Sequence, residues 1–234
     1  IELKRGEVPE VVLNNLYKQT QLQDTFGMNM VALINGQPKL CNLKDLVEVF
    51  LQHRREVVTR RTVFNLRKAR ERGHVLEGLA VALANIDDFI AIIRNAPTPP
   101  VAKVELMSRP WDSKLVREML TRTREDGGTI NADDYRPDGL EKAFGMGSDG
   151  LYRLSETQAQ EILQMRLQRL TGLEQDKIVA EYKEVMAEID DLLDILSRPE
   201  RVSTIISEEL TAVRTEFGQT KLGARRSFIE HSAQ

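Results

Sequence analysis

Apolar residues recur along two long segments of the chain at spacings typical of helices that pack against each other. No proline occurs between residues 43 and 95, and the second half of this segment has apolar residues alternately four and three apart. A second segment, from about Glu174 to Leu196, has the same alternation, and after Pro199 a further helix is expected at 200–217. Such spacing predicts a coiled coil. The two apolar series are Val75, Leu79, Ala82, Ile86, Phe89, Ile93 and Ile178, Tyr182, Val185, Ile189, Leu192, Leu196.

The first half of the 43–95 segment has a weaker apolar pattern. One series of positions is apolar every seven residues, but the intervening heptad positions become basic after Val47. This half of the predicted helix contact is therefore only half apolar. The apolar positions are Leu43, Phe50, Val57 and Phe64, and the basic ones are Arg54, Arg61 and Lys68.

Local signals predict the elements before the first long helix. Pro9 suits the first turn of a helix within residues 7–22, because its missing N–H is not needed there. Asn35-Gly36 predicts the turn of a β-hairpin within residues 26–42, since both turn residues need positive φ. Asn42 is placed to cap the long helix.

The segment between the two long helices is more broken. Short helices are predicted at 101–107 and 112–122, and residues 124–139 are turn-rich. The sequence SETQ at 155–158 is a capping box, in which Ser and Gln each bond the other's backbone N–H. It predicts a helix that reaches about Leu170 before Thr171-Gly172 ends it.

Two long helices joined in this way should pair antiparallel. We predict a mainly α protein: a long antiparallel coiled coil with a small globular helical head at its tip and a short β-hairpin at its base. The register set by the connection places Ile93 near Ile178 and Val75 near Leu196. The expected domains are 1–42 with the short helix and hairpin, 43–95 as the outgoing helix, 96–173 as a globular dimerisation head, 174–217 as the returning helices and 218–234 as a C-terminal tail.

Composition limits the classes of protein. Aromatic residues make up 5% of the 234 residues, which suits a thin aliphatic seam better than a large compact core. The net charge of −3 predicts no general affinity for nucleic acid or anionic membranes. The single Cys41 excludes an internal disulfide, and no metal-ligand spacing is present. No membrane span or signal peptide is visible, so a cytoplasmic protein without a membrane partner is expected. The abrupt start at IELKR suggests a fragment.

A basic run, HRREVVTRRTVFNLRKARER at residues 53–72, has two interpretations. It holds eight Lys and Arg against two acids. The first interpretation is the solvated face of a long helix, supported by acidic residues within 200–217 on the expected partner helix. The second is contact with a polyanion through charge alone. No aromatic platform is expected among these residues, so stacking on single strands is not predicted. The candidate DNA-facing residues are Arg54, Arg55, Arg60 and Arg61.

The helix that begins at the capping box also has two interpretations. It could pack on its own head as an amphipathic helix. It could instead form a homodimer surface, because a small tip buries little unless it meets a partner, and Met, Arg and Leu beside Gln suit an adaptable interface. The candidate interface residues are Gln158, Ile162, Leu163, Arg166, Leu167 and Leu170.

Three stretches carry a resemblance to a known family: NNLYKQTQLQDTFGMNMVAL, the run from NGQPKLCNLKDL to LAVALANID, and SETQAQEILQMRLQRLTGLE. They closely resemble the A subunit of bacterial DNA gyrase, a type IIA topoisomerase. The resemblance covers most of the chain and is weakest at about 108–149. It implies a fragment that starts at the end of the tower and includes the coiled-coil stalk and the dimerisation head that forms the exit gate (C-gate).

The resemblance also implies a mechanical role in ATP-dependent supercoiling by double-strand passage. The transported duplex would leave between two heads, while Mg and ATP would be used outside this fragment. None of the chain's tyrosines has the context of the family's DNA-cleaving tyrosine, so no catalytic, cofactor-binding or metal residue is assigned. The tyrosines are Tyr17, Tyr135, Tyr152 and Tyr182.

The implied partners are a second copy through the head, duplex DNA, the B subunit of gyrase and protein gyrase poisons at the gate, with Arg166 as a contact. Three alternatives stay open. One is the equivalent part of the topoisomerase IV A subunit, and another is a structural coiled-coil dimerisation module without a DNA role. The third is a complete enzyme, although no Walker loop, nucleophile elbow, Cys/His cluster or paired carboxylates are visible. The fragment alone should therefore be inactive.

Overall fold

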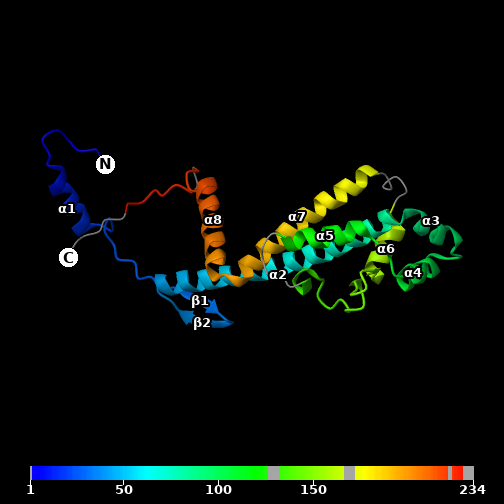
Figure 1. The fold of residues 1–234 in the computed structure, drawn as a ribbon. Coiled ribbons are helices and arrows are strands. Elements are labelled where there is room, and N and C mark those ends of the chain that lie inside the picture. Colours follow the sequence, from blue (N-terminus) through cyan, green and yellow to red (C-terminus); the bar gives the residue numbers. More distant parts are fainter. Residues whose placement is uncertain (1, 126–131, 166–171, 221–222, 229–234) are drawn as a thin grey trace. The chain divides into compact units, whose positions relative to one another are not determined.

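The computed structural model describes residues 2–125, 132–165, 172–220 and 223–228. The chain is mainly helical, as predicted, with small two-stranded sheets (Figure 1). It divides into two units, Ile1–His53 and Arg54–Gln234, which are described separately below.

The first unit contains helix α1 (Pro9–Gln19) and a hairpin of β1 (Val31–Ile34) and β2 (Gln37–Leu40). Pro9 occupies the first turn of α1, as predicted. The hairpin turn is also confirmed, because Asn35 and Gly36 both have positive φ, 53° and 80°. The strands pair antiparallel, with Val31 opposite Leu40.

Helix α2 (Leu43–Ala84) begins with a reciprocal cap. The Asn42 Oδ1 atom accepts from the Asp45 N–H at 2.8 Å, and the Asp45 carboxylate accepts from the Asn42 N–H at 3.0 Å. The predicted capping role of Asn42 is therefore confirmed, with Asp45 as its partner. Among the described residues of this first unit, only Cys41 is buried.

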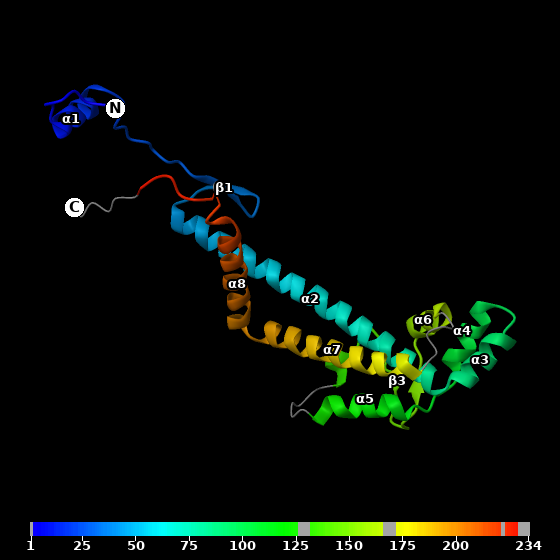
Figure 2. The same cartoon turned by 90° about the horizontal axis from the view of Figure 1, so that it is seen from above.

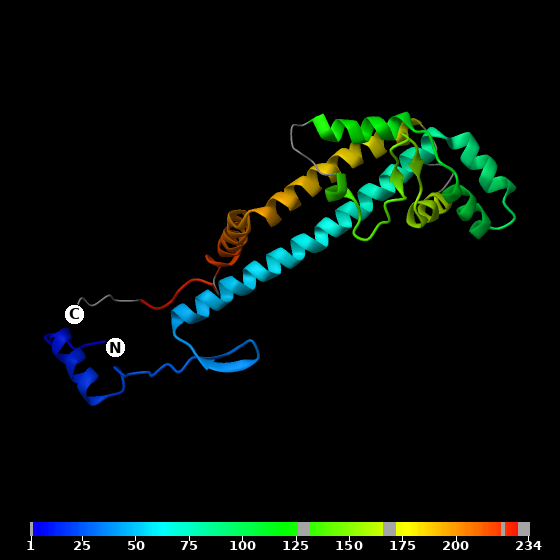
Figure 3. The same cartoon turned by 60° about the horizontal axis from the view of Figure 1, so that its bottom comes forward.

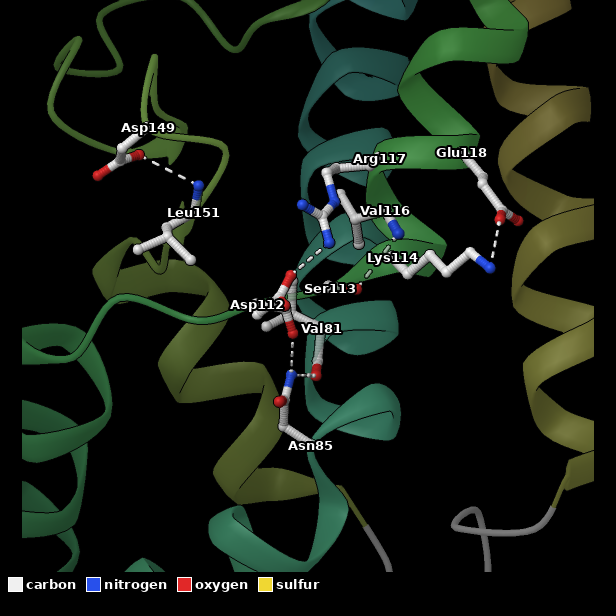
Figure 4. Close-up of polar contacts among 10 residues, drawn as sticks. All are labelled: Val81, Asn85, Asp112, Ser113, Lys114, Val116, Arg117, Glu118, Asp149 and Leu151. Carbon is white, nitrogen blue, oxygen red and sulfur yellow. Dashed lines mark hydrogen bonds and ion pairs between the residues drawn. The ribbon is translucent and has the colours of Figure 1, made fainter.

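In the second unit, the predicted uninterrupted helix over 43–95 is wrong. Helix α2 ends at Ala84, and a separate helix, α3 (Ile86–Asn95), follows after Asn85, whose φ and ψ are −124° and 35°. The Asn85 Nδ2 group donates to the Val81 carbonyl at 3.0 Å and to the Asp112 carbonyl at 2.8 Å (Figure 4). An amide side chain that bonds nearby carbonyls competes with helix continuation, which gives the break a physical cause.

Short elements follow α3. Ser113 caps the second helix after α3, with its Oγ atom accepting from the Val116 N–H at 3.2 Å (Figure 4). The Trp111 ring lies 4.1 Å from the Phe89 ring, centroid to centroid. The two helices predicted at 101–107 and 112–122 are present as α4 (Pro99–Ser108) and α5 (Lys114–Glu125), with shifted ends. The elements are α4 (Pro99–Ser108), α5 (Lys114–Glu125), η1 (Ala132–Tyr135), β3 (Gly145–Met146), β4 (Tyr152–Arg153) and α6 (Glu156–Gln164).

Helix α7 (Gly172–Ser197) runs antiparallel beside the second half of α2 (Figures 1 and 3). Gly73 of α2 lies against Met186, and Glu77, further along α2, bonds Tyr182, earlier in α7. Helix α8 (Pro199–Phe217) follows a one-residue break and points away from the line of α7 (Figure 2). The predicted interruption at Ser197-Arg198-Pro199 is therefore confirmed.

The predicted register between the outgoing and returning helices is wrong. It placed Tyr182 opposite position 89, whereas Tyr182 bonds Glu77, about three helical turns earlier in α2. The cause is the break at Asn85: because α2 ends at Ala84 instead of about Asn95, α7 aligns with an earlier part of it. Near α8 the expected register is nearly right, since Arg61 binds Glu209.

The inner face of α2 also differs from the prediction in its first half. Phe64 was expected in the helix contact but its side chain is 59% exposed. Helix α7 agrees better with the prediction, because its apolar series is buried from Ile178 to Leu192. In α8 the predicted apolar residues Leu210, Val213 and Phe217 are exposed. Seven of the buried α2 positions form a series three and four apart: Val58, Thr62, Leu66, Ala69, Gly73, Leu76 and Ala80. The other buried positions, His74, Gly78, Val81 and Ala82, lie in the second half of the helix, where more of its surface is covered.

Candidate functional site

A group of polar side chains, most of them buried and Glu77 half-buried, lies where α2, β4, α6 and α7 meet. It includes one carboxyl, one imidazole and two phenols, and their mutual hydrogen bonds connect all four elements. We call it the Glu77 cluster. Its members are His74, Glu77, Tyr152, Ser155, Gln158 and Tyr182.

The Glu77 carboxyl is shared by two tyrosines from different elements. The Tyr152 hydroxyl of β4 donates to Oε2 at 2.7 Å, and the Tyr182 hydroxyl of α7 donates to Oε1 at 3.0 Å. Burial raises the pKa of Glu77, while these two hydrogen bonds and the Arg136 guanidinium oppose that rise. Burial and the neighbouring Glu77 also raise the pKa of both tyrosines, which keeps them protonated as donors.

Gln158 extends the cluster into α6. Its Nε2 group donates to the Tyr152 hydroxyl at 2.7 Å and to the His74 carbonyl at 2.6 Å, and its Oε1 atom accepts from the Ser155 N–H at 3.0 Å. The Ser155 Oγ atom accepts in turn from the Gln158 N–H, so the predicted capping box is confirmed. The same side chain therefore caps α6 and attaches it to α2.

His74 completes the cluster from α2. Its Nε2 atom lies 2.7 Å from Ser155 Oγ and its Nδ1 atom 3.2 Å from Gln158 Nε2. Burial, with a further contribution from Arg136, lowers the pKa of His74 to about 4, so the ring is neutral at pH 7. A neutral ring with its proton on Nε2 donates to Ser155 Oγ. The contact of Nδ1 with Gln158 Nε2 is the longer one, because the two hydrogens of that amide already bond the Tyr152 hydroxyl and the His74 carbonyl.

The sequence interpretation missed this cluster. Tyr182 was assigned only to the apolar series, and His74 and Glu77 were not singled out. The available signal was the presence of an imidazole and a carboxyl, three residues apart, inside the otherwise apolar stretch HVLEGLAVALA at residues 74–84. Because the cluster bonds its polar groups to one another, its chemistry is structural and positions α6 against α2 and α7.

The predicted interface residues of α6 do not form one exposed surface. Gln158 and Ile162 have exposed fractions of 0% and 4%, so both pack inside this chain and their place in a partner surface stays a prediction. Gln158 is held by the Glu77 cluster, and Ile162 belongs to the hydrophobic core. Leu163 is half-buried. Helix α6 ends at Gln164, and Arg166, Leu167 and Leu170 lie outside the described residues.

Ion pairs occupy most of the basic run. Within the described residues, seven of its eight basic side chains pair with an acid, and Arg55 is the exception. The seven paired side chains share five acidic partners, so a positive surplus is left. The pairs are Arg54 and Arg61 with Glu209, Arg60 with Glu56, Arg67 and Lys68 with Glu71, Arg70 with Asp138, and Arg72 with Glu181.

The four candidate DNA-facing residues fall into two pairs. Arg54 and Arg61 reach across to Glu209 of α8, and the Arg54 side chain is only 26% exposed. Arg55 is exposed, and the Arg60 side chain is 78% exposed although it pairs with Glu56. The structure therefore gives Arg54 and Arg61 a role in helix packing and leaves Arg55 and Arg60 facing solvent.

One aromatic residue lies among these basic side chains, which is fewer than the row of aromatics that stacking on single strands uses. Phe64 is exposed, and Arg60, Arg61, Arg67 and Lys68 are its neighbours three and four positions away on the helix surface. In the described parts of the chain, no group of three or more His, Cys, Asp or Glu could hold a metal ion. No helix among those residues is long and apolar enough to cross a membrane.

Comparison with known proteins defines the class. The profile of the family that comprises the A subunits of DNA gyrase and topoisomerase IV matches residues 1–211. The chain therefore belongs to this family.

Individual relatives within the family are DNA gyrase A subunits. The A subunit of Pseudomonas aeruginosa DNA gyrase is 55% identical over 221 residues, which are 94% of this chain and 23% of the relative. The Escherichia coli K12 protein of the same name is 59% identical over 182 residues, covering 78% of this chain and 20% of the relative. The Haemophilus influenzae protein is 49% identical over 222 residues. The chain thus spans about a quarter of the length of these relatives.

Proposed function

We propose that this chain is the part of the DNA gyrase A subunit that forms the coiled-coil stalk and the exit gate. One observation carries the proposal: α7 returns antiparallel along α2, and a group of short helices (α3, α4 and α6) lies at the end where α2 stops (Figure 3). A helix pair that carries helices at its far end suits a gate on an arm. Family membership supplies the DNA-handling context.

In this proposal the part described here is non-catalytic. The heads of two copies meet, and the transported duplex leaves between them during ATP-dependent supercoiling. Cleavage, Mg and ATP belong to other parts of the enzyme, which works with the gyrase B subunit in the cytoplasm. A gate that must hold and then open requires an interface of moderate size, not an obligate one. Protein poisons of gyrase would bind the same gate, with Arg166 as a proposed contact.

The test is the oligomeric mass of the chain. We expect a dimer in sedimentation equilibrium. The double variant Leu163→Glu/Leu167→Glu should lower the fraction of dimer at least tenfold, because charges replace apolar side chains at the proposed contact. The helical circular dichroism signal should not change.

The matched control is Val63→Glu, which places the same charge at an exposed apolar position of α2. It should leave the dimer intact. A monomeric parent chain, or equal loss of dimer in both variants, would exclude a gate built on α6 and its continuation.

A structural dimerisation module without a DNA role is the main competing function. The positive surplus on α2 and the solvent-facing Arg55 and Arg60 favour the DNA-related function. Salt-dependent retention on duplex DNA separates the two, because contact with phosphates weakens as salt rises. The equivalent part of the topoisomerase IV A subunit has the same architecture in this proposal, and supercoiling as opposed to decatenation by the whole enzyme distinguishes it.

A further inference from the structure

The Glu77 cluster contains one polar path that connects the returning helix to α6. The path begins at the Tyr182 hydroxyl on α7, passes through the Glu77 carboxyl on α2 and the Tyr152 hydroxyl on β4, and ends at the Gln158 amide on α6. Three hydrogen bonds of 2.7–3.0 Å form it. Within the described residues, the Tyr182 hydroxyl bonds Glu77 and no atom of α6.

We infer that Glu77 is a joint through which the position of α7 sets the orientation of α6. The inference deepens the proposed function, since it names the residues by which a stalk would act on a gate. The two Glu77 oxygens are separately occupied, so α7 cannot slide along α2 without breaking the Tyr182 bond. If the Tyr182 hydrogen bond to one Glu77 oxygen is lost, the Tyr152 hydrogen bond to the other oxygen changes, because linked hydrogen bonds polarise one another. The hydrogen bond from Gln158 to Tyr152 changes in turn.

The packing around the joint supports this role. Tyr152 and Gln158 have no exposed surface, so a broken hydrogen bond there would not be replaced by water. A Cβ atom at Gly78 would lie 2.8 Å from Gln158 Cγ, so α2 and α6 touch beside the joint. Gln158 also holds the Ser155 cap, so a displaced amide would loosen the first turn of α6.

Tyr182→Phe tests the inference, because it removes one hydroxyl that makes no hydrogen bond to α6. We expect amide hydrogen exchange within residues 155–164 to become about tenfold faster, the effect of one lost hydrogen bond. Tyr152→Phe should do the same, and Glu77→Gln, which keeps the shape of the side chain, should affect both α6 and α7.

The matched control is Tyr135→Phe. Its hydroxyl bonds Asp190, also on α7, at a more exposed position outside the Glu77 cluster. This variant should leave exchange in α6 unchanged. The inference is overturned if Tyr182→Phe leaves α6 exchange at the parent rate, or if Tyr135→Phe accelerates it equally. Exchange is measured whether or not the chain dimerises, so a monomeric chain would refute the proposed gate and leave the joint standing.

Discussion

Gly78 of α2 and Gln158 of α6 are in direct contact, with room for no additional atom between them. A Cβ atom added at Gly78 would lie 2.8 Å from Gln158 Cγ and 2.9 Å from Gln158 Cβ. The Gln158 side chain cannot move aside, because its amide is bonded to His74, Tyr152 and the Ser155 backbone. The close approach of the two helices therefore depends on glycine at this position.

Gly78→Ala should destabilise the chain by about 1–3 kcal/mol, the usual cost of an added methyl group in a tightly packed site. Chemical denaturation followed by circular dichroism measures it. The control is Gly73→Ala on the same helix, where the nearest atom is the flexible end of Met186. At Gly73 the better helix propensity of alanine should offset the cost of displacing the Met186 methyl group, so the stability of the chain should change little. Equal losses in both variants would contradict a specific α2–α6 contact.

The buried imidazole of His74 predicts a pH dependence of stability. The pKa of His74 in the folded chain is about 4, below the ordinary value of 6.5. The contribution of the neutral ring to the free energy of unfolding is therefore complete above pH 6.5. As the pH falls toward 4, the unfolded chain gains a proton that the folded chain does not. The contribution therefore declines by roughly 3 kcal/mol over this window.

Denaturation curves between pH 7 and 4.5 would measure this decline. Because the pKa of Glu77 is raised above its ordinary value of 4.5, Glu77 makes the chain more stable as the pH falls toward 4.5, opposite to His74. The parent must therefore be compared with a variant that lacks only the imidazole. His74→Gln should flatten the pH dependence, whereas His53→Gln, at an exposed position of the same helix, should not. A parent and a His74→Gln variant with parallel pH profiles would refute a neutral buried ring.

The basic face of α2 gives a prediction for DNA binding. Arg55→Gln/Arg60→Gln should weaken binding to a duplex and reduce the slope of log affinity against log salt by about 2, because both side chains face solvent. Fluorescence anisotropy over a salt series would measure this.

Arg54→Gln/Arg61→Gln is the matched comparison. It should change the slope less and should lower the stability of α8 packing, since both residues bind Glu209. If this second variant lost more DNA affinity than the first, the division of the four arginines would be wrong.

The break between α2 and α3 is open to a direct test. Asn85→Ala removes two side-chain hydrogen bonds, to the carbonyls of Val81 and Asp112. We expect a loss of about 1–2 kcal/mol in stability, even though alanine is the better helix former. Asn95→Ala, at the exposed end of α3, should cost much less. Thermal unfolding compares the two, and an Asn85→Ala variant as stable as the parent would show that packing alone ends α2.

Sequence reasoning succeeded where adjacent residues decide the structure. The Asn35-Gly36 turn and the Ser155–Gln158 cap each depend on a few neighbouring residues, and both were predicted correctly. The prediction of the register between α2 and α7 failed because the register depends on where α2 ends. Asn85 ends it by bonding the Asp112 carbonyl, a partner 27 residues away that no local pattern indicates.

The prediction of which α2 residues form its inner face failed for a related reason. A seven-residue series that includes Phe64 and a three-and-four series that includes Leu66 both fit the same sequence. Only the path of the returning helices selects the second. The Glu77 cluster was missed because isolated His, Glu and Tyr residues look like exposed polar positions until four elements converge on them.

The antiparallel register of α2 and α7 also restricts how such a chain can change in length. An insertion in one of these helices would move every later contact out of step unless an equal insertion arose opposite it. The one-residue break between α7 and α8 is exempt, because non-helical Arg198 is not held to either helix's repeat. Homologous chains of unequal length should therefore differ at this break or in the connections between the short helices, and not within the paired segments.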